Sequence, residues 1–402
     1  MYFQSKNKAE CCGCEACSHV CGKKAITMQD DGCGFKYPVI DESLCVKCGM
    51  CESVCPLANK PIKAEFAARF FALRSKDDAM VRRSSSGGMV GLMAEEVFSR
   101  GGVMYGVVYG EGFRVEHARA ENMQEAEAFK TSKYVQSDIS AMYETLKKDL
   151  AEGRTVLVTG TPCQIAGVKN WLAASRTDTS LLYTCDNICH GVSSPLTFSD
   201  YLASLTKYIP DGDYIDSVNM RYKDKSGCTR LEISAKETGT IQEIHQYSYH
   251  RLYQNRIANR PACFACQFTS YNRQGDITVA DFWNHKPTDF AFDTQYGISE
   301  TLVNSSKGQE LFDAIRDKAY YQEVSKEKAW QPHLEYPTQR PEAYDRFWSE
   351  YLKTNNREQV MKDYLKVSPV YRMILFVIPI LRKTGLYTFC GRLYKKVFVR
   401  KK

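Results

Sequence analysis

The distribution of apolar residues divides the 402-residue chain into a short N-terminal segment, a long middle segment and a basic end. In the first segment, residues 25–28 and 37–40 are short apolar runs that predict two strands. Residues 61–65 have the composition of a linker. We therefore expect a small domain over residues 6–60, a second domain over 61–345, and a helical tail over 346–402.

The middle segment alternates predicted strands with predicted helices. Apolar runs predict strands over residues 66–74, 103–109, 155–160 and 181–184. Apolar positions recur at helical spacing over residues 89–99, and a second helix is expected over 139–152. Apolar and polar residues alternate over 214–250, which predicts antiparallel strands. This order of elements predicts a multidomain protein of the α+β or α/β class.

A doubled cysteine run dominates the first segment, which holds ten of the chain's 17 cysteines. The two runs have the same spacing, Cys-x2-Cys-x2-Cys-x3-Cys, and consist of Cys11, Cys14, Cys17 and Cys21, then Cys45, Cys48, Cys51 and Cys55. Tandem runs of this kind are typical of a bacterial ferredoxin with two 4Fe-4S clusters. Paired cysteines also suit zinc, which is the alternative, but two complete runs favour iron–sulfur clusters.

The last cysteine of each run ligates the other cluster in such ferredoxins, because three thiolates on one tight loop fill three corners of one cube. This predicts one cluster on Cys11, Cys14, Cys17 and Cys55, and another on Cys45, Cys48, Cys51 and Cys21. Cys12 and Cys33 fall outside the pattern and are expected to be bystanders.

Composition and charge narrow the class of protein. Hydrophobic residues make up 44% and charged residues 25%, as in an ordinary soluble protein. With no recognisable signal peptide, so many cysteines indicate metal ligands in a reducing cytoplasm. The net charge is +7, but ten Lys and Arg lie after residue 363 with no acid among them, leaving about −3 for the rest. The charge therefore gives no reason to expect a nucleic-acid partner.

Two loops in the middle segment carry candidate ligand-binding residues. Ser85, Ser86, Gly87 and Gly88 precede the predicted helix at 89–99, and free N–H groups at a helix start suit a phosphate. A plain capped helix explains the same residues equally well. The strand at 155–160 ends in Gly-Thr-Pro-Cys before another helix, which is where open α/β sheets bind ligands.

Four further cysteines stand at strand or turn ends: Cys163, Cys189, Cys263 and Cys266. Thiolates from separate loops can hold a third 4Fe-4S cluster, although a structural zinc or unpaired buried thiols also fit this spacing. Cys185, Cys228 and Cys390 have no partner by spacing. His190 and Asp281 are candidates for proton transfer or cofactor contact, with a structural role as the alternative.

The C-terminal end has an apolar run, residues 373–381, between basic residues. Nine residues with a proline are too short to cross a bilayer, which takes about 20. Such a run suits an anchor on an anionic membrane surface, or a helix packed on the protein body.

Taken in order, these motifs resemble the β-subunit family of coenzyme F-420 hydrogenases and dehydrogenases, which includes plant 7-hydroxymethyl chlorophyll a reductase. The resemblance covers about residues 8–320. It adds residues 132–137, Cys189-His190-Gly191, Asp276-Ile277-Thr278 and Asp281-Phe282-Trp283 to the motifs above. It implies a mixed α/β flavin-binding domain after the two-cluster ferredoxin fold, with a third cluster beside the flavin.

The resemblance also implies the cofactor contacts. FAD would contact Ser85, Ser86, Gly87, Gly88, Ser132, Lys133, Tyr134, Gln136 and Thr161. The flavin-proximal cluster would be held by Cys163, Cys189, Cys263 and Cys266. No Gly-x-Gly-x-x-Gly motif supports direct NAD(P)H binding.

The expected function is an iron–sulfur flavoprotein oxidoreductase. A ferredoxin or other one-electron donor would supply the clusters, and FAD would reduce an unidentified organic substrate, with His190 or Lys133 supplying a proton. One alternative is an electron-transfer subunit that feeds a partner enzyme. Another is a reductase at the membrane surface in a surface-polysaccharide pathway.

Overall fold

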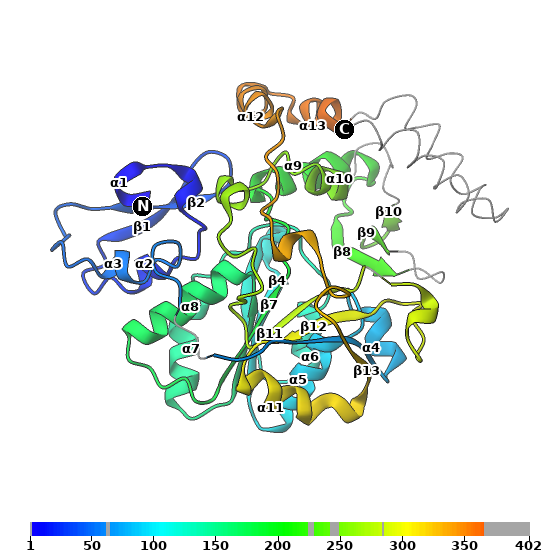
Figure 1. Cartoon of the computed structure of the whole chain (residues 1–402). Coiled ribbons are helices and arrows are strands. Elements are labelled where there is room, and N and C mark those ends of the chain that lie inside the picture. Colours follow the sequence, from blue (N-terminus) through cyan, green and yellow to red (C-terminus); the bar gives the residue numbers. More distant parts are fainter. Residues whose placement is uncertain (1, 62–64, 224–228, 242–248, 284, 366–402) are drawn as a thin grey trace, which may run out of the picture.

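The structure, a computed structural model, describes residues 2–61, 65–223, 229–241, 249–283 and 285–365. Its N-terminal unit contains one antiparallel pair of strands, β1 (Ile26–Asp30) and β2 (Lys36–Ile40), and three short helices, α1 (Tyr2–Ser5), α2 (Ala16–His19) and α3 (Met50–Ser53). Both strands were predicted from the sequence, and each observed strand begins within one residue of the predicted first residue. In Figure 1 this unit lies at one side of the molecule, against the helices of the larger domain.

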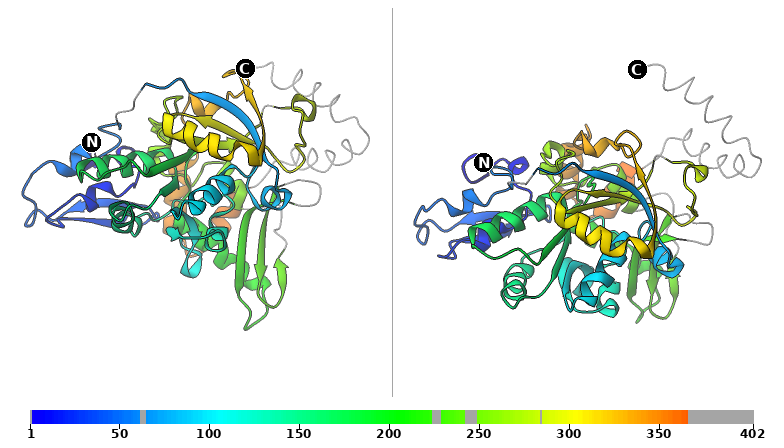
Figure 2. Two further views of the ribbon diagram at one scale, coloured as in Figure 1. Left: turned by 90° about the horizontal axis from the view of Figure 1, so that it is seen from below. Right: turned by 60° about the horizontal axis from the view of Figure 1, so that its bottom comes forward.

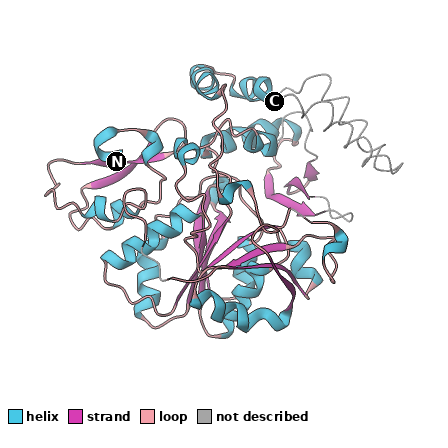
Figure 3. Ribbon diagram, in the orientation of Figure 1, coloured by secondary structure: helices cyan, strands magenta, loops and turns pink. Residues whose placement is uncertain are grey.

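In the described part of the chain, the larger domain is built on an eight-stranded mixed sheet, in the order β13-β3-β12-β11-β7-β6-β4-β5. The strands of this sheet are magenta in Figure 3, with helices packed around them. The strands are β3 (Arg69–Ser75), β4 (Val103–Tyr109), β5 (Val115–Ala120), β6 (Val156–Gly160), β7 (Leu182–Asn187), β11 (Ile277–Asp281), β12 (Ser299–Val303) and β13 (Ala319–Val324). The four central strands, β4, β6, β7 and β11, are parallel, and the outer ones pair antiparallel. The mixed α/β domain expected from the sequence is therefore present.

Helices cover both faces of this sheet because each face is apolar. One core joins Phe71, Leu73 and Met104 of the sheet to α4 (Asp78–Arg83), α5 (Met89–Ser99) and α11 (Ser306–Ile315). The opposite core joins Tyr105 and Val158 to α7 (Met142–Ala151) and α8 (Pro162–Ala174). The short helix α6 (Met123–Ala126) follows β5. Figure 2 shows helices on both sides of the strands.

A third core lies beyond the sheet and includes the first part of the predicted tail. It gathers α9 (Pro195–Leu205), α10 (Tyr249–Gln254), α12 (Tyr344–Lys353) and α13 (Arg357–Leu365) with β8 (Ile215–Lys223) and β9 (Thr229–Ala235). The strand β10 (Gly239–Ile241) pairs with β9. The antiparallel strands predicted for 214–250 are present, but the prediction was wrong at its end because α10 begins at Tyr249. The apolar run at 373–381 lies outside the described residues.

The N-terminal unit is packed tightly on α8. Gly167 faces the Cys11–Cys17 loop so closely that a Cβ atom there would lie 2.7 Å from Cys14 Sγ and 2.8 Å from its Cβ. Tyr143 of α7 donates a hydrogen bond from its hydroxyl to the carbonyl of Cys14, and its ring stacks on His19. The first cysteine loop is therefore fixed against the helix that begins at Pro162.

Replacing Gly167 should loosen this contact. We expect Gly167→Ala to lower the free energy of unfolding by about 1–3 kcal/mol, the usual effect of overpacking a filled interface, and to lower the retained iron. Gly22→Ala is the matched control, because nothing lies within 4 Å of a Cβ at Gly22. Denaturant unfolding and iron content of both variants measure the difference, and equal values would contradict the tight contact.

Candidate functional site

A large cavity of about 530 Å³ opens at the carboxyl ends of the parallel strands. Its walls include the residues that follow β6 and β7, among them Thr161 and Cys189, and Asp281 at the end of β11. This is the edge at which open α/β sheets place ligands, because the turns after neighbouring parallel strands meet there. The volume lies in the range of cofactor and ligand pockets.

One end of the cavity is formed by the start of α5. Gly88, with a φ of 93°, is the N-cap residue of α5 and has no side chain that could accept a hydrogen bond. The first backbone N–H groups of α5 therefore lack the side-chain acceptor that a capping residue usually provides. Ser84, Ser85 and Ser86 precede it and line the same wall. Ser85 Oγ accepts a hydrogen bond of 2.8 Å from the backbone N–H of Ser132 and lies 3.0 Å from its hydroxyl. An uncapped helix start with hydroxyls around it suits an anion such as a phosphate.

The structure places seven of the nine predicted flavin contacts on the cavity wall: Ser85, Ser86, Gly88, Ser132, Lys133, Tyr134 and Thr161. Gly87 and Gln136 lie outside it. Gly87 is pressed against the sheet, where a Cβ would lie 2.3 Å from the carbonyl oxygen of Leu73. Gln136 points toward the first cysteine loop and donates a 3.1 Å hydrogen bond to the carbonyl of Cys12.

Lys133 lines the cavity, but its ammonium group holds the loop together. Nζ donates to the carbonyls of Ala128 at 2.7 Å and Lys130 at 2.9 Å, with Thr131 at 3.4 Å. Burial lowers the pKa of Lys133 to about 7. Because three backbone carbonyls surround Nζ, the geometry favours a loop-positioning role for Lys133 over proton supply.

Beside the serines that precede α5 lies a charged and aromatic group whose central residue, Arg221, no sequence pattern revealed. Arg221 of β8 pairs with Asp281 at 2.7 Å and donates to the carbonyl of Ser85 at 2.7 Å. Its other nitrogen donates to the hydroxyl of Tyr134 at 3.2 Å, and that ring stacks on Tyr253 with centroids 4.3 Å apart. Tyr134 is half-buried. Arg221 lies in an ordinary alternating strand, so no motif marked it.

His190 lines the cavity immediately after Cys189. Its ring centroid lies 4.2 Å from that of His333. Burial, and then the neighbouring His333, lower the pKa of His190 to about 4, so the imidazole is neutral at pH 7. A neutral imidazole can donate or accept one hydrogen bond at the cavity.

The four cysteines predicted for a third cluster are neighbours, and one of them, Cys189, lines the cavity. Cys189 interacts electrostatically with Cys163, Cys263 and Cys266, and Cys263 and Cys266 each interact with Cys163. Burial, followed by these and other local contacts, raises the pKa of Cys263 to about 12 and of Cys266 to about 11. Among the described residues, no three or more His, Cys, Asp or Glu side chains are close enough to hold a single metal ion.

Each of these four sulfurs has a hydrogen-bonding partner, which lies in its own loop for all but Cys263. The backbone N–H groups of Gly191, Val192 and Phe268 donate to Cys189, Cys263 and Cys266, each at 3.4 Å. The hydroxyl of Thr161 lies 3.3 Å from Cys163 Sγ. Hydrogen bonds to cysteine sulfur are a main determinant of the potential of iron–sulfur clusters. The donor set and its surroundings therefore fit a 4Fe-4S cluster.

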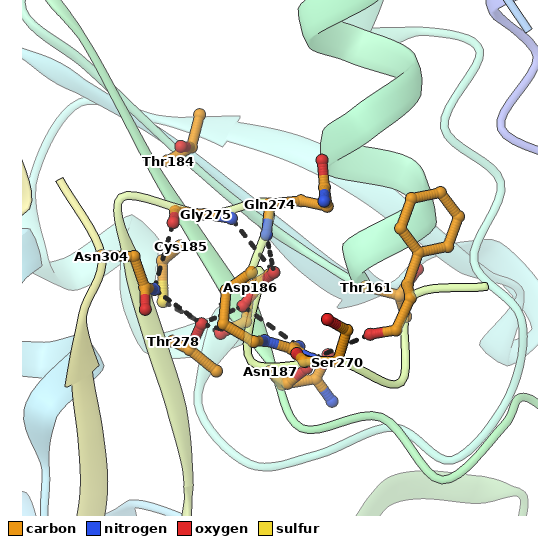
Figure 4. Close-up of polar contacts among 12 residues, drawn as sticks. Thr161, Thr184, Cys185, Asp186, Asn187, Ser270, Gln274, Gly275, Thr278 and Asn304 are labelled. Atoms are coloured by element: carbon orange, nitrogen blue, oxygen red, sulfur yellow. Dashed lines mark hydrogen bonds and ion pairs between the residues drawn. The ribbon is translucent and has the colours of Figure 1, made fainter. Parts of the chain in front are cut away.

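A buried network around Asp186 sets the positions of two of these loops (Figure 4). The Asp186 carboxylate accepts hydrogen bonds of 3.0 Å from the N–H groups of Gln274 and Gly275, and pairs with Arg273 at 3.3 Å. Arg273 also donates to the carbonyls of Asn187 at 2.7 Å and Phe268 at 3.0 Å. Asn187 lies two residues before Cys189 and Phe268 two residues after Cys266, so one buried ion pair joins the two cysteine loops.

The first cysteine run lies against the third set of thiols. Cys17 interacts electrostatically with Cys11 and Cys55, and Cys14 with Cys17 and Cys11, so the four cysteines expected on the first cluster are together. Cys12, expected to be a bystander, is buried, and its thiol lies beside those of two predicted ligands, Cys14 and Cys163. No spacing rule indicates this, because Cys12 contacts a helix about 150 residues away in the sequence.

The second run faces outward. Cys48 is exposed, Cys45 and Cys51 are partly exposed, and Cys21 lies on the other loop with its sulfur accepting a 3.4 Å hydrogen bond from Ala25 N–H. Cys228 and Cys390 lie outside the described residues. Within the described residues, no helix is of the length and apolarity that a membrane span requires.

The family comparisons agree with the motifs. Residues 10–59 match the family described as "4Fe-4S dicluster domain", and residues 153–329 match the family of the C-terminal part of the coenzyme F420 hydrogenase/dehydrogenase β subunit. The resemblance predicted from the sequence is thus confirmed. The cysteines at 163, 189, 263 and 266 all fall inside the second match.

Two individual proteins are similar to this chain. The F subunit of the F(420)H(2) dehydrogenase of Methanosarcina mazei is 21% identical over 331 residues, which cover 77% of this chain and 83% of the relative. A chain of the solved F420-reducing [NiFe] hydrogenase complex from Methanosarcina barkeri is 14% identical, with a TM-score of 0.42, and the match covers 74% of this chain and 94% of that one.

A buried carboxyl group behind the cavity makes stability depend on pH. Glu300 of β12 accepts a 2.6 Å hydrogen bond from Gln331, which lines the cavity, and its other oxygen is buried without a partner among the described residues. Burial raises the pKa of Glu300 to about 8 from 4.5. Between these values the folded state keeps a proton that the unfolded chain has lost, so the free energy of unfolding falls as the pH rises.

We therefore expect Glu300→Gln to flatten the loss of stability between pH 5 and pH 8, where each unit contributes at most about 1.4 kcal/mol. Exposed Glu335→Gln is the control and should keep the slope of the parent protein. Urea unfolding across this pH range measures both variants, and an unchanged slope in Glu300→Gln would contradict the protonated state of Glu300.

Proposed function

We propose that this member of the coenzyme F420 hydrogenase/dehydrogenase β-subunit family, fused to a 4Fe-4S dicluster domain, is an iron–sulfur flavoprotein oxidoreductase. Electrons pass between a one-electron donor, three 4Fe-4S clusters and FAD, which reduces an organic substrate. The observation that carries the proposal is the position of Cys163. It lies beside Cys12 of the first cysteine loop, and its sulfur is 3.3 Å from the hydroxyl of Thr161 on the cavity wall.

The exposure of the cysteines supports an order for the proposed clusters. Exposed Cys48 belongs to the outer cluster, on which a ferredoxin or another one-electron donor would dock. Buried Cys14 belongs to the inner cluster and packs on α8, whose second residue is Cys163. Cys189, of the third set, forms part of the cavity wall. The thiols therefore form a continuous series from the surface to the cavity.

The cavity supports a flavin as the final cofactor. The uncapped start of α5 and the serines before it suit the pyrophosphate, and Met89, Met104 and Phe129 form an apolar part of the wall that suits a ring system. A bound flavin accepts electrons singly and passes them on as a pair. The residues of this chain orient it, exclude water and supply hydrogen bonds at the reacting end.

The end of the cavity near Cys189 can hold a polar substrate group. His190 is neutral there at pH 7, so its imidazole can donate a hydrogen bond to a substrate atom but has no imidazolium proton to transfer. The Arg221–Asp281 pair also lines the cavity and can orient a polar substrate group. We assign His190 as a hydrogen-bond donor to the substrate and Lys133 as a loop-positioning residue.

A second candidate function is an electron-transfer subunit whose substrate reaction takes place on a partner protein. The name of the relative from Methanosarcina mazei favours it, because that protein is one subunit of a dehydrogenase. In this case the exposed cluster on Cys48 would be the docking point for the partner. The membrane-surface alternative depends on residues 373–381, outside the described part of the chain.

Loss of a third-cluster ligand tests the electron path. We expect Cys266→Ser to lose about four irons per chain, since a cube has four irons, while it keeps the flavin. Electrons from a reduced donor should then reach the flavin at least about 100-fold more slowly, because the cluster nearest the cavity is missing. Stopped-flow absorbance of flavin bleaching measures the rate.

Cys33→Ser is the matched control, because it removes a cysteine that belongs to none of the predicted ligand sets. This variant should keep the iron content and the rate of flavin reduction of the parent protein. A Cys266→Ser protein with full iron and parent kinetics would exclude the third cluster. Substrate turnover by the isolated chain would exclude the electron-transfer subunit as the function.

A further inference from the structure

Arg260 is a fully buried arginine at the junction of the cysteine loops, and neither the motifs nor the family match gives it a role. Its residue exposure is 1%. Its backbone N–H donates a 2.9 Å hydrogen bond to the carbonyl of Val192, three residues after Cys189. It also precedes the short helical turn Pro261–Ala265, which carries Cys263. The backbone of Arg260 thus belongs to the third-cluster loops.

The side chain of Arg260 reaches across to the N-terminal unit. Nε donates to the carbonyl of Cys11 at 2.7 Å, and Nη2 donates to Cys11 Sγ at 3.4 Å and to the carbonyl of Lys36 at 2.9 Å. The guanidinium lies 4.2 Å from the centre of the Tyr37 ring. Nη1 donates to Gln136 Oε1 at 2.9 Å. A single side chain therefore links the first cysteine loop and β2 of the N-terminal unit to the larger domain.

The packing around this guanidinium leaves it no freedom. Gly13, between Cys11 and Cys14, has a φ of +71°, and a Cβ there would lie 2.7 Å from Arg260 Nη1 and 2.5 Å from Gln136 Nε2. The first cysteine loop thus approaches Arg260 so closely that any side chain at Gly13 would displace it. The fork geometry of arginine suits this set of fixed acceptors, since lysine presents one flexible point charge.

The charge of Arg260 lies beside sulfur atoms and forms no ion pair among the described residues. No Asp or Glu in the described part of the chain forms a salt bridge with it, whereas the equally buried Arg273 pairs with Asp186. Cys11, Tyr37, Cys12 and Cys263 interact with it electrostatically, and so does the buried Glu15 of the first cysteine loop. A buried charge without a partner is costly. Thiolate-bound clusters on both sides would compensate it, because reduction makes each cluster more negative.

We propose that Arg260 is a positioning residue that joins the inner ferredoxin-type cluster to the third cluster. Its hydrogen bonds fix the Cys11 loop against the Cys263 loop, and its charge stabilises the reduced state of the inner cluster. The proposal rests on the proposed function, because it requires clusters on Cys11 and Cys263.

The test is a potentiometric titration of the full-length, anaerobically purified chain, followed by electron paramagnetic resonance of the reduced clusters. Arg260→Met removes the charge and nearly keeps the volume. We expect its inner cluster to be reduced with an equilibrium constant at least tenfold lower, a shift of about 59 mV for one electron. Arg260→Lys keeps the charge. The equilibrium constant for reduction of its inner cluster should therefore stay within about threefold of that of the parent protein.

Arg273→Lys is the matched control: it is a second buried arginine near a cluster cysteine, but its charge is paired with Asp186 and its hydrogen bonds stay in the larger domain. It should leave the inner-cluster potential unchanged. Parent-like potentials in Arg260→Met with full iron would overturn the proposal. So would a shift in Arg260→Lys as large as the tenfold change expected of Arg260→Met, a measurement that also decides the matter if Arg260→Met retains too little iron. If the parent chain itself lacks the three clusters, the proposed function fails before any variant is made.

Discussion

The close packing of the first cysteine loop against the larger domain is the contact on which the proposed chemistry depends. Gly13 and Gly167 allow this approach because neither has a side chain, and the hydroxyl of Tyr143 holds the loop by its Cys14 carbonyl. Arg260 then fills the remaining space with hydrogen bonds to Cys11 and Lys36. Two units that differ in fold are thereby joined at the point where the predicted cluster ligands are most concentrated.

The sheet places the other half of the site. Because β6, β7 and β11 are parallel neighbours, the turns that follow them meet at one edge. Cys163 and Cys189 follow two of these strands, and Asp281 ends the third. The Asp186–Arg273 pair then fixes the loop that carries Cys266 beside that of Cys189. A cavity bordered by thiols on one side and an uncapped helix start on the other is the result.

Much of this arrangement could be predicted from the sequence, because it depends on local patterns. The apolar runs located β4, β6 and α5 closely, and cysteine spacing indicated the ferredoxin-type runs and suggested a third set, whose members the fold brings together. The sequence could not show the contacts of Arg221, Arg260 and Cys12, because their roles arise from chain segments that only the fold brings together. Lys133 illustrates the converse: its motif suggested chemistry, and the carbonyls around its ammonium group show how it holds a loop.

The central claim is that the chain holds a continuous path from an exposed cluster to a flavin. Anaerobic purification followed by quantification of iron, sulfide and flavin tests it most directly. The account predicts about twelve irons, as much sulfide, and one FAD per chain, since three cubes contain four irons each. About eight irons with FAD would remove the third cluster and return Cys163, Cys189, Cys263 and Cys266 to structural roles, while zinc in place of iron would contradict the account as a whole.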